Sequence, residues 1–171
     1  EIKKLHQRVK TTVIFVTHDQ EEAVVLADRV ALILDGRLKQ YDRPEVFYKR
    51  PVDEATARFF GGQNFVSGVA KGGVFECSLG QLKLPSDTHE GAGKLTFRPE
   101  NIKVGVPAKG ENVVQMTLVD KIYLGTQTRL KLAVGDEKIE VIANPGDAEG
   151  LAAGQSCSLK LPPESLWVLA D

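Results

Sequence analysis

Thr12-Val13-Ile14-Phe15-Val16-Thr17-His18-Asp19-Gln20 is the stretch that decides the fold of the first part of this chain. Its four consecutive apolar residues leave no polar face, which predicts a strand covered on both sides, as in a parallel sheet. Asp19 is placed to cap the N-terminus of a following helix with apolar residues at 24–26. His18 therefore stands at the carboxyl end of a buried strand, where open α/β sheets bind ligands. The sequence predicts a functional site there.

The residues around His18 follow one another in an order that resembles a known family. Thr17-His18-Asp19 is followed by Glu22-Ala23 and then by Leu26-Ala27-Asp28-Arg29. With these motifs, residues 5–64 resemble the end of the nucleotide-binding subunit of ABC transporters, in the importer branch related to the maltose-type ATPases. In that family a switch histidine contacts the γ-phosphate of ATP and helps to hold the attacking water in a closed dimer. The resemblance implies this role for His18.

Other readings of these residues do not involve nucleotide. A histidine at a strand end can belong to the core or cap a helix, and the ordered motif weighs against that alternative. His18 and Glu22 are spaced i,i+4 and could share a metal ion, but two ligands are too few for a site. Asp19, Asp28 and Arg29 are expected to cap and anchor their helix rather than to perform chemistry.

The segment after this helix predicts a hairpin and two short helices. Residues 30–34 form a second apolar strand, Asp35-Gly36 is a two-residue hairpin turn, and residues 37–41 return. Pro44 suits the first turn of a helix through residue 48, and a second helix is expected at about 52–60. Gly61-Gly62-Gln63-Asn64 then marks a domain boundary, because helical spacing stops there. The predicted domains are residues 1–61 and 62–171.

From Phe65 onward the pattern predicts β-structure throughout, most simply an OB-type barrel. Trp167 is expected to plug it. Phe97-Arg98-Pro99-Glu100 resembles the arginine-proline-glutamate turn of the TOBE-type regulatory domain that the same transporter branch carries, and Arg98 and Glu100 are open to either a functional contact or a structural ion pair. The expected strands are Val74 to Ser78, Leu82 to Leu84, Leu95 to Phe97, Ile102 to Val106, Val113 to Tyr123, Thr126 to Val134, Lys138 to Ala143, Ser156 to Leu161 and Leu166 to Leu169.

The expected fold class is an α/β fragment, the end of a P-loop nucleotide-binding domain, followed by an all-β OB-type barrel. The chain begins inside an amphipathic helix without an initiator methionine or an N-cap, which indicates a fragment. The strands at 13–16 and 30–34 are therefore expected to lack sheet neighbours, and each uncovered large apolar side chain forfeits about 1.5–3 kcal/mol.

Two short motifs imitate nucleotide-binding loops. Gly93-Lys94 is the only Gly-Lys pair, but Leu95 follows it where a phosphate-binding loop needs serine or threonine, and Thr88 replaces the first glycine. Phe60-Gly61-Gly62-Gln63 resembles an ABC signature loop, yet it lies downstream of His18 and leads into strands. We expect the chain alone to be inactive as an ATPase and to bind neither ATP nor Mg²⁺, although the intact subunit would use both.

Composition excludes several classes of function. The formal net charge of −1 gives no electrostatic footprint for nucleic acid or for an anionic membrane. Only 6% of the residues are aromatic, so an OB-fold nucleic-acid binder is disfavoured. No apolar run approaches the roughly 20 residues that span a bilayer, so membrane association is expected through a partner protein. Cys77 and Cys157 lack metal-ligand spacing.

The resemblance implies the C-terminal part of a transport ATPase subunit that drives solute import. Its partners would be a second copy of the subunit, transmembrane permease subunits and a small-molecule or protein regulator at the barrel. It would lie at the cytoplasmic face of the membrane, held there by the permease. The alternative is a non-catalytic sensing barrel that also stabilises the subunit dimer. The transported solute stays open.

Overall fold

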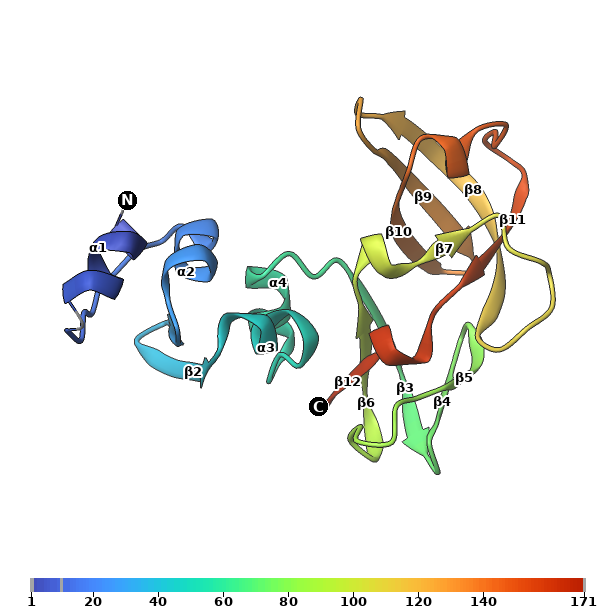
Figure 1. The fold of residues 1–171 in the computed structure, drawn as a ribbon. Helices are drawn as coiled ribbons and strands as arrows, with labels where there is room; N and C mark the ends of the chain where they lie inside the picture. Colours follow the sequence, from blue (N-terminus) through green and yellow to red (C-terminus); the bar gives the residue numbers. More distant parts are fainter. Residues whose placement is uncertain (1, 10, 171) are drawn as a thin grey trace. The chain divides into compact units, whose positions relative to one another are not determined.

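The computed structural model describes residues 2–9 and 11–170. The chain divides into two compact units, residues 1–60 and 61–171, which are described separately here. Figure 1 shows the helices gathered in the first unit and the strands β3 to β12 in the second. This arrangement confirms the predicted fold class, a short α/β segment followed by an all-β domain.

Among its described residues, the first unit contains four short helices and one hairpin, whose bounds are α1 Ile2–Val9, α2 Gln20–Leu26, β1 Val30–Leu34, β2 Arg37–Asp42, α3 Pro44–Lys49 and α4 Glu54–Phe59. The hairpin turns at Asp35 and Gly36, which have φ values of 50° and 72° as a type I′ turn requires. Strands β1 and β2 pair antiparallel from Val30 opposite Asp42 to Leu34 opposite Arg37. The predicted hairpin and the predicted helix start at Pro44 are confirmed.

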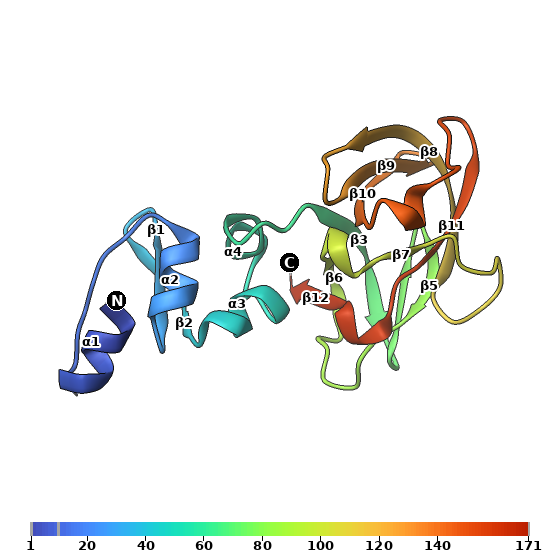
Figure 2. The same cartoon turned by 45° about the horizontal axis from the view of Figure 1, so that its top comes forward.

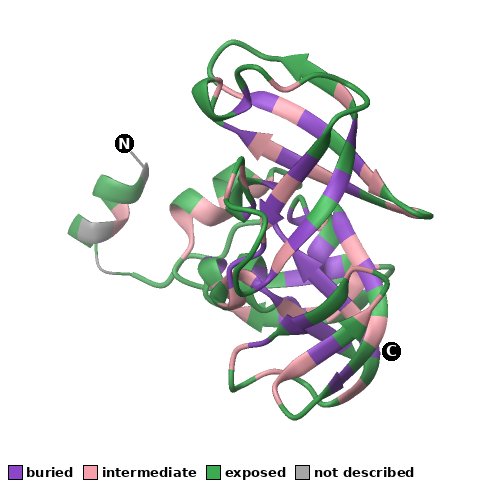
Figure 3. Cartoon of the chain, turned by 90° about the vertical axis from the view of Figure 1, so that its right-hand side faces the viewer, coloured by how far each residue is buried: buried purple, intermediate pink, exposed green. Residues whose placement is uncertain are grey.

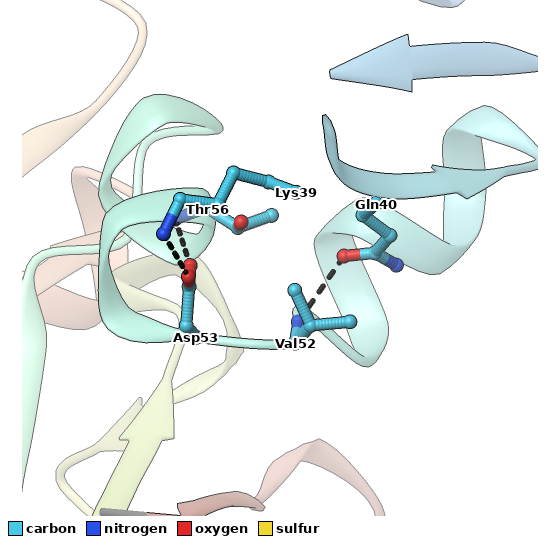
Figure 4. A network of polar contacts seen from close by, with 5 residues as sticks. All are labelled: Lys39, Gln40, Val52, Asp53 and Thr56. Carbon is cyan, nitrogen blue, oxygen red and sulfur yellow. Dashed lines mark hydrogen bonds and ion pairs between the residues drawn. The ribbon is translucent and has the colours of Figure 1, made fainter. Parts of the chain in front are cut away.

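A small aromatic cluster and a polar network hold this unit together. Phe47 and Phe60 are buried with Leu32, and the two rings lie 4.8 Å apart. In Figure 4, the Asp53 carboxylate accepts from the Thr56 backbone N–H at 2.7 Å and pairs with Lys39 Nζ at 2.9 Å. Burial by itself raises the pKa of Asp53, but the bonds from Thr56 and Lys39 together outweigh it and leave the pKa below its ordinary value.

A second contact in the same view joins β2 to the chain before α4. The Gln40 side-chain oxygen accepts from the Val52 backbone N–H at 3.1 Å, and its amide nitrogen donates to the Arg50 carbonyl at 3.3 Å. Gln40 is buried, so both of its polar ends are satisfied within the unit. Hydrogen bonds thus connect the hairpin to the segment that joins α3 and α4.

The strand predicted over Val13 to Val16 does not form. Residues 11–17 carry no strand pairing, and Ile14 and Val16 are 90% and 98% exposed. A strand exists only where another backbone supplies its hydrogen bonds, and among the described residues none lies alongside this segment. Figure 3 shows it as exposed chain following α1. The prediction of a buried strand at Val13 to Val16 is therefore wrong for this structure, because its apolar pattern finds no strand to pair with among the described residues.

The second unit consists of two five-stranded antiparallel sheets (Figures 1 and 2). One has the order β10-β9-β8-β11-β7 and the other β12-β6-β3-β4-β5. The strand bounds are β3 Asn64–Lys71, β4 Val74–Cys77, β5 Gly80–Lys83, β6 Gly91–Phe97, β7 Lys103–Val104, β8 Val113–Tyr123, β9 Thr128–Val134, β10 Glu137–Ala143, β11 Ser156–Lys160 and β12 Trp167–Ala170. Three 3₁₀ turns accompany them: η1 Pro99–Asn101, η2 Gly146–Ala148 and η3 Pro163–Ser165.

Inward-facing apolar residues from both sheets fill the core of this unit, as the buried positions in Figure 3 indicate. Gly68 has Phe75 packed directly over it, so that a Cβ there would meet the ring at 2.6 Å. Trp167 does not plug the barrel as expected. It is only half buried on the edge strand β12, and the neighbouring Leu166 and Val168 point into the core instead.

Two buried asparagines close the seams between the sheets. Asn64 on β3 donates to the Glu140 carbonyl at 2.9 Å and accepts from the Glu140 N–H at 2.8 Å. Asn112 forms the same pair of bonds with Lys83, at 2.9 Å and 2.7 Å. Each side-chain amide thereby takes the place of a neighbouring strand along an edge, β10 in one sheet and β5 in the other. These two contacts join the two sheets, one between β3 and β10 and the other between β5 and the segment that precedes β8.

Candidate functional site

His18 lies in the turn that leads from the extended segment 11–17 into α2, and its side chain is exposed. In the described part of the chain it has no hydrogen-bond partner. The predicted site is therefore not a histidine sealed in a core, and its imidazole does not cap a helix. Both alternatives from the sequence are excluded by this position.

The residues on either side of His18 are firmly held. The Thr17 hydroxyl donates to the Glu22 carboxylate at 2.6 Å and accepts from the Asp19 N–H at 3.0 Å. Asp19 Oδ1 accepts from the N–H groups of Glu21 and Glu22 at 2.8 Å and 3.1 Å, so Asp19 is the predicted N-cap. The backbone is fixed before and after His18 while the imidazole itself stays available to a ligand.

The pairing of Glu22 with Thr17 was not foreseen from the sequence. Only the other bond of the Thr17 hydroxyl, which accepts from the Asp19 N–H two residues on, belongs to the local turn chemistry that a sequence can signal. One oxygen of the Glu22 carboxylate accepts from the Thr17 hydroxyl. No group of three His, Cys, Asp or Glu side chains that could hold a metal is present among residues 2–9 and 11–170.

The cap predicts how the turn responds to mutation. Asp19→Ala removes the acceptor for two backbone N–H groups and should destabilise α2 by about 1 kcal/mol. Because α2 has no buried residues to compensate, its amides should exchange with solvent faster, which NMR-detected hydrogen exchange would measure. Asp19→Asn keeps the capping oxygen and should behave like the parent chain. Equal exchange in all three proteins would show that the cap does not hold the turn.

Arg29, at the end of the motif, acts structurally. Its guanidinium lies 5.5 Å from the centroid of the Tyr41 ring on β2, a cation–π contact that ties the chain after α2 to the hairpin. The expectation that Arg29 anchors the helix stays a prediction, because this contact joins Arg29 to the hairpin and not to α2. Asp28 is exposed.

Both motifs that resemble nucleotide-binding loops, Gly93-Lys94 and Gly61-Gly62-Gln63, have structural roles. Gly93-Lys94 lies within β6, opposite Ala170 and Leu169 of β12, and opens no helix. The Gln63 side-chain amide lies against the Glu140 carboxylate beside the Asn64 contact, and with its nitrogen assigned to that side it donates to the two carboxylate oxygens at 2.6 Å and 3.2 Å. The Gly-Gly-Gln segment thus fastens the start of the barrel to β10. In the arginine-proline-glutamate turn, Arg98 is buried and Glu100 is exposed.

The two cysteines are free thiols. Cys157 is buried and Cys77 is half buried, and in both cases burial raises the pKa of the thiol. Reactive cysteines need the opposite shift, so neither is suited to nucleophilic chemistry.

Comparisons with known proteins give a consistent picture. The TOBE domain family model matches residues 95–169. Over all of this chain, the spermidine/putrescine import ATP-binding protein PotA of Ruegeria pomeroyi is 33% identical, and the match covers 49% of that protein. The Fe(3+) ions import ATP-binding protein FbpC 2 of Rhodococcus jostii is 38% identical across 82% of this chain and 43% of its own length. The chain spans about half the length of these relatives.

A solved structure resembles the chain in fold. The cytoplasmic molybdate-binding protein ModG superposes with a TM-score of 0.54 and 12% sequence identity, covering 65% of this chain and 98% of ModG. At that identity the likeness concerns the fold alone, and it agrees with an OB-type architecture for the β unit. Among the described helices, none is both long and apolar enough to cross a membrane.

Proposed function

Because this chain belongs to the ATP-binding subunits of ABC importers and carries their TOBE domain, we propose that it is the switch-histidine and regulatory part of a transport ATPase subunit. Residues 1–61 form the end of the nucleotide-binding domain and residues 62–171 the regulatory barrel. The division of the chain into compact units at residue 60 supports these limits. The complete subunit hydrolyses ATP with Mg²⁺ to drive solute import.

The observation that carries this proposal is the turn around His18. Its neighbours are fixed by Thr17 and Asp19, and its imidazole is exposed and unpaired within the described residues. A neutral imidazole can donate one hydrogen bond and accept another, so it can bond a phosphate oxygen and a water together. In the subunit it contacts the γ-phosphate and holds the attacking water. Positioning of this kind is the main protein contribution to phosphoryl transfer.

The proposed partners follow from the same assignment. Two copies of the subunit form a homodimer, and permease subunits hold the dimer at the cytoplasmic face of the membrane. The exposed run Val13 to Val16 supports packing of this segment against another strand in the complete nucleotide-binding domain. Leaving four apolar side chains in contact with water costs free energy that such packing would recover. Relatives named for spermidine/putrescine and for Fe(3+) import are similarly identical to this chain, so the proposal is made for solute import as a class.

The chain by itself is expected to have no ATPase activity. Its sequence contains no Gly-x-x-x-x-Gly-Lys-Ser/Thr loop, and the one Gly-Lys pair lies within β6. Incubating the purified chain with ATP and Mg²⁺ should release phosphate at the rate of the buffer blank. The His18→Ala chain provides the matched control for contaminating ATPases. Mg²⁺-dependent ATP hydrolysis that is lost in that variant would contradict the proposal that the chain alone has no ATPase activity.

A second candidate function is a non-catalytic regulatory barrel that senses a ligand or protein and stabilises the dimer. It is favoured by the separate core of the second unit and by its closure at Asn64 and Asn112. Calorimetric titration of the chain with spermidine and with ferric citrate tests it. Saturable heat favours a solute sensor, whereas no heat together with a concentration-dependent dimer favours a stabilising role.

A further inference from the structure

The β unit has a groove of ≈ 600 Å³ between the two edges of one of its sheets. Residues 100–106, from η1 through β7, line one side. The end of β10, η2 and the turn between β8 and β9 line the other. Strands β7 and β10 are the outermost strands of the sheet β10-β9-β8-β11-β7. The groove therefore lies where this sheet curls round without its two edges pairing.

The edge of β10 presents free backbone groups to the groove. Both the N–H and the C=O of Glu140 bond the Asn64 side chain, so they point away from β9. In an antiparallel pair, residues alternate between facing the partner strand and facing away. Ile142, two residues further along β10, must therefore direct its N–H and C=O outward as well, and Ile142 lines the groove. The contact between the Asn64 side chain and Glu140 covers only the first half of this edge.

The edge of β7 has the same property. The Leu161 N–H donates to the Asn112 carbonyl on the β8 side, so by alternation Lys160 faces β7, where its partner is Lys103. The next residue, Val104, then turns its N–H and C=O away from β11 and toward the open edge. Val104 also lines the groove. Across the described residues, neither Val104 nor Ile142 has a hydrogen bond on this outer side.

The side chains around these edges suit an extended peptide. Ile102, Ile142 and Ala143 supply an apolar floor, while Glu100, Asp147 and Lys103 are exposed at the rim. Two carboxylates against one ammonium favour a basic side chain on the ligand. Unpaired strand edges are templates for added strands, in which main-chain bonds give affinity and alternate side chains give specificity.

We propose that this groove binds an extended, basic peptide segment of a partner protein, which adds a strand between β7 and β10. Its backbone pairs with Val104 and Ile142, its alternate apolar side chains rest on the floor, and a lysine or arginine lies near Glu100 and Asp147. The inference concerns the β unit alone and does not depend on the role of His18 in ATP hydrolysis.

The test uses the ¹⁵N-labelled chain and the peptide acetyl-Lys-Val-Thr-Val-Lys-amide. We expect saturable chemical-shift changes at millimolar peptide, concentrated in residues 102–106 and 140–144, with slower hydrogen exchange at the Ile142 amide. N-methylation of the central threonine removes one donor and should weaken binding by about two- to tenfold. Absence of shifts, shifts spread over other strands, or equal binding of the methylated peptide would overturn the proposal.

Two variants separate strand addition from other modes of binding. Val104→Pro removes an outward N–H that takes no part in the ladder, and edge strands tolerate proline there. It should weaken peptide binding while leaving Trp167 fluorescence unchanged. Should the proline disturb the fold, Glu100→Gln provides the second variant, and it should weaken the basic peptide through charge alone. Displacement of the peptide by lysine amide at equal concentration would indicate a simple cation site and refute strand addition.

Discussion

Replacing His18 by alanine in the complete subunit should lower steady-state ATP hydrolysis about tenfold to a hundredfold while ATP affinity changes little. A hydrogen bond to a charged group contributes about 1.5–3 kcal/mol, and the proposed bond to the γ-phosphate is made as the reaction proceeds. Affinity for ATP depends mainly on the phosphate-binding loop, which this chain does not contain. Phosphate release and fluorescent-nucleotide binding, measured on the same preparation, would separate the two effects.

Two matched variants make this test specific. His18→Gln keeps a hydrogen-bond donor at nearly the same reach and should retain more activity than alanine. His89→Ala changes an exposed histidine of the β unit and should leave turnover unchanged. If His18→Ala lowers ATP affinity as strongly as turnover, the residue contributes ground-state binding and not catalysis. Wild-type turnover in the alanine variant would remove His18 from the mechanism altogether.

Most elements of the β unit could be predicted from the sequence because their signals are local. The expected limits Val113 to Tyr123 coincide with β8, and most of the other strands lie within a few residues of their predicted positions. Alternation of apolar residues and glycine-containing turns specify such strands directly. In the first unit, the N-cap at Asp19 and the turn at Asp35-Gly36 could also be predicted, because caps and tight turns depend on neighbouring residues.

What the sequence did not reveal depends on residues far apart in the chain. Val13 to Val16 has the composition of a buried strand, but whether it becomes one depends on a neighbouring backbone. Trp167 is large and apolar, yet the direction of β12 places it on the outer side of the core. The contact of Asn64 with Glu140 spans 76 positions, and no local pattern marks it.

The functional role of His18 stays a prediction, because it rests on the sequence motif alone. The motif predicted where the residue stands in the chain, and the cap at Asp19 explains the shape of the turn. The Thr17–Glu22 bond that holds the other side of the turn was not anticipated. The sequence motif therefore names His18 as a candidate, and the structure adds the hydrogen bonds that shape the turn around its exposed imidazole.

Asn64→Ala is expected to destabilise the barrel by about 2–4 kcal/mol. The substitution removes two hydrogen bonds and leaves the N–H and C=O of Glu140 without partners, at about 1–3 kcal/mol for each group. Asn64 is only 1% exposed, so water does not readily take the place of its amide. Because domains of this kind are stable by about 5–15 kcal/mol, the loss should be plain in urea unfolding. Trp167 is the only tryptophan and belongs to the β unit, so its fluorescence reports this transition alone.

The comparison with two other substitutions identifies the amide as the cause. Asn101→Ala alters an exposed asparagine of η1 and should change stability by less than about 0.5 kcal/mol. Asn64→Asp keeps an acceptor for the Glu140 N–H but turns its second oxygen toward the Glu140 carbonyl, so it should be at least as damaging as alanine. A barrel that tolerates Asn64→Asp would mean that water satisfies the Glu140 carbonyl and that β3 and β10 are joined mainly by apolar packing. If the contact instead depends on both ends of the Asn64 amide, Asn64→Asp should destabilise the barrel, because among the described residues the N–H and C=O of Glu140 have no other hydrogen-bond partner.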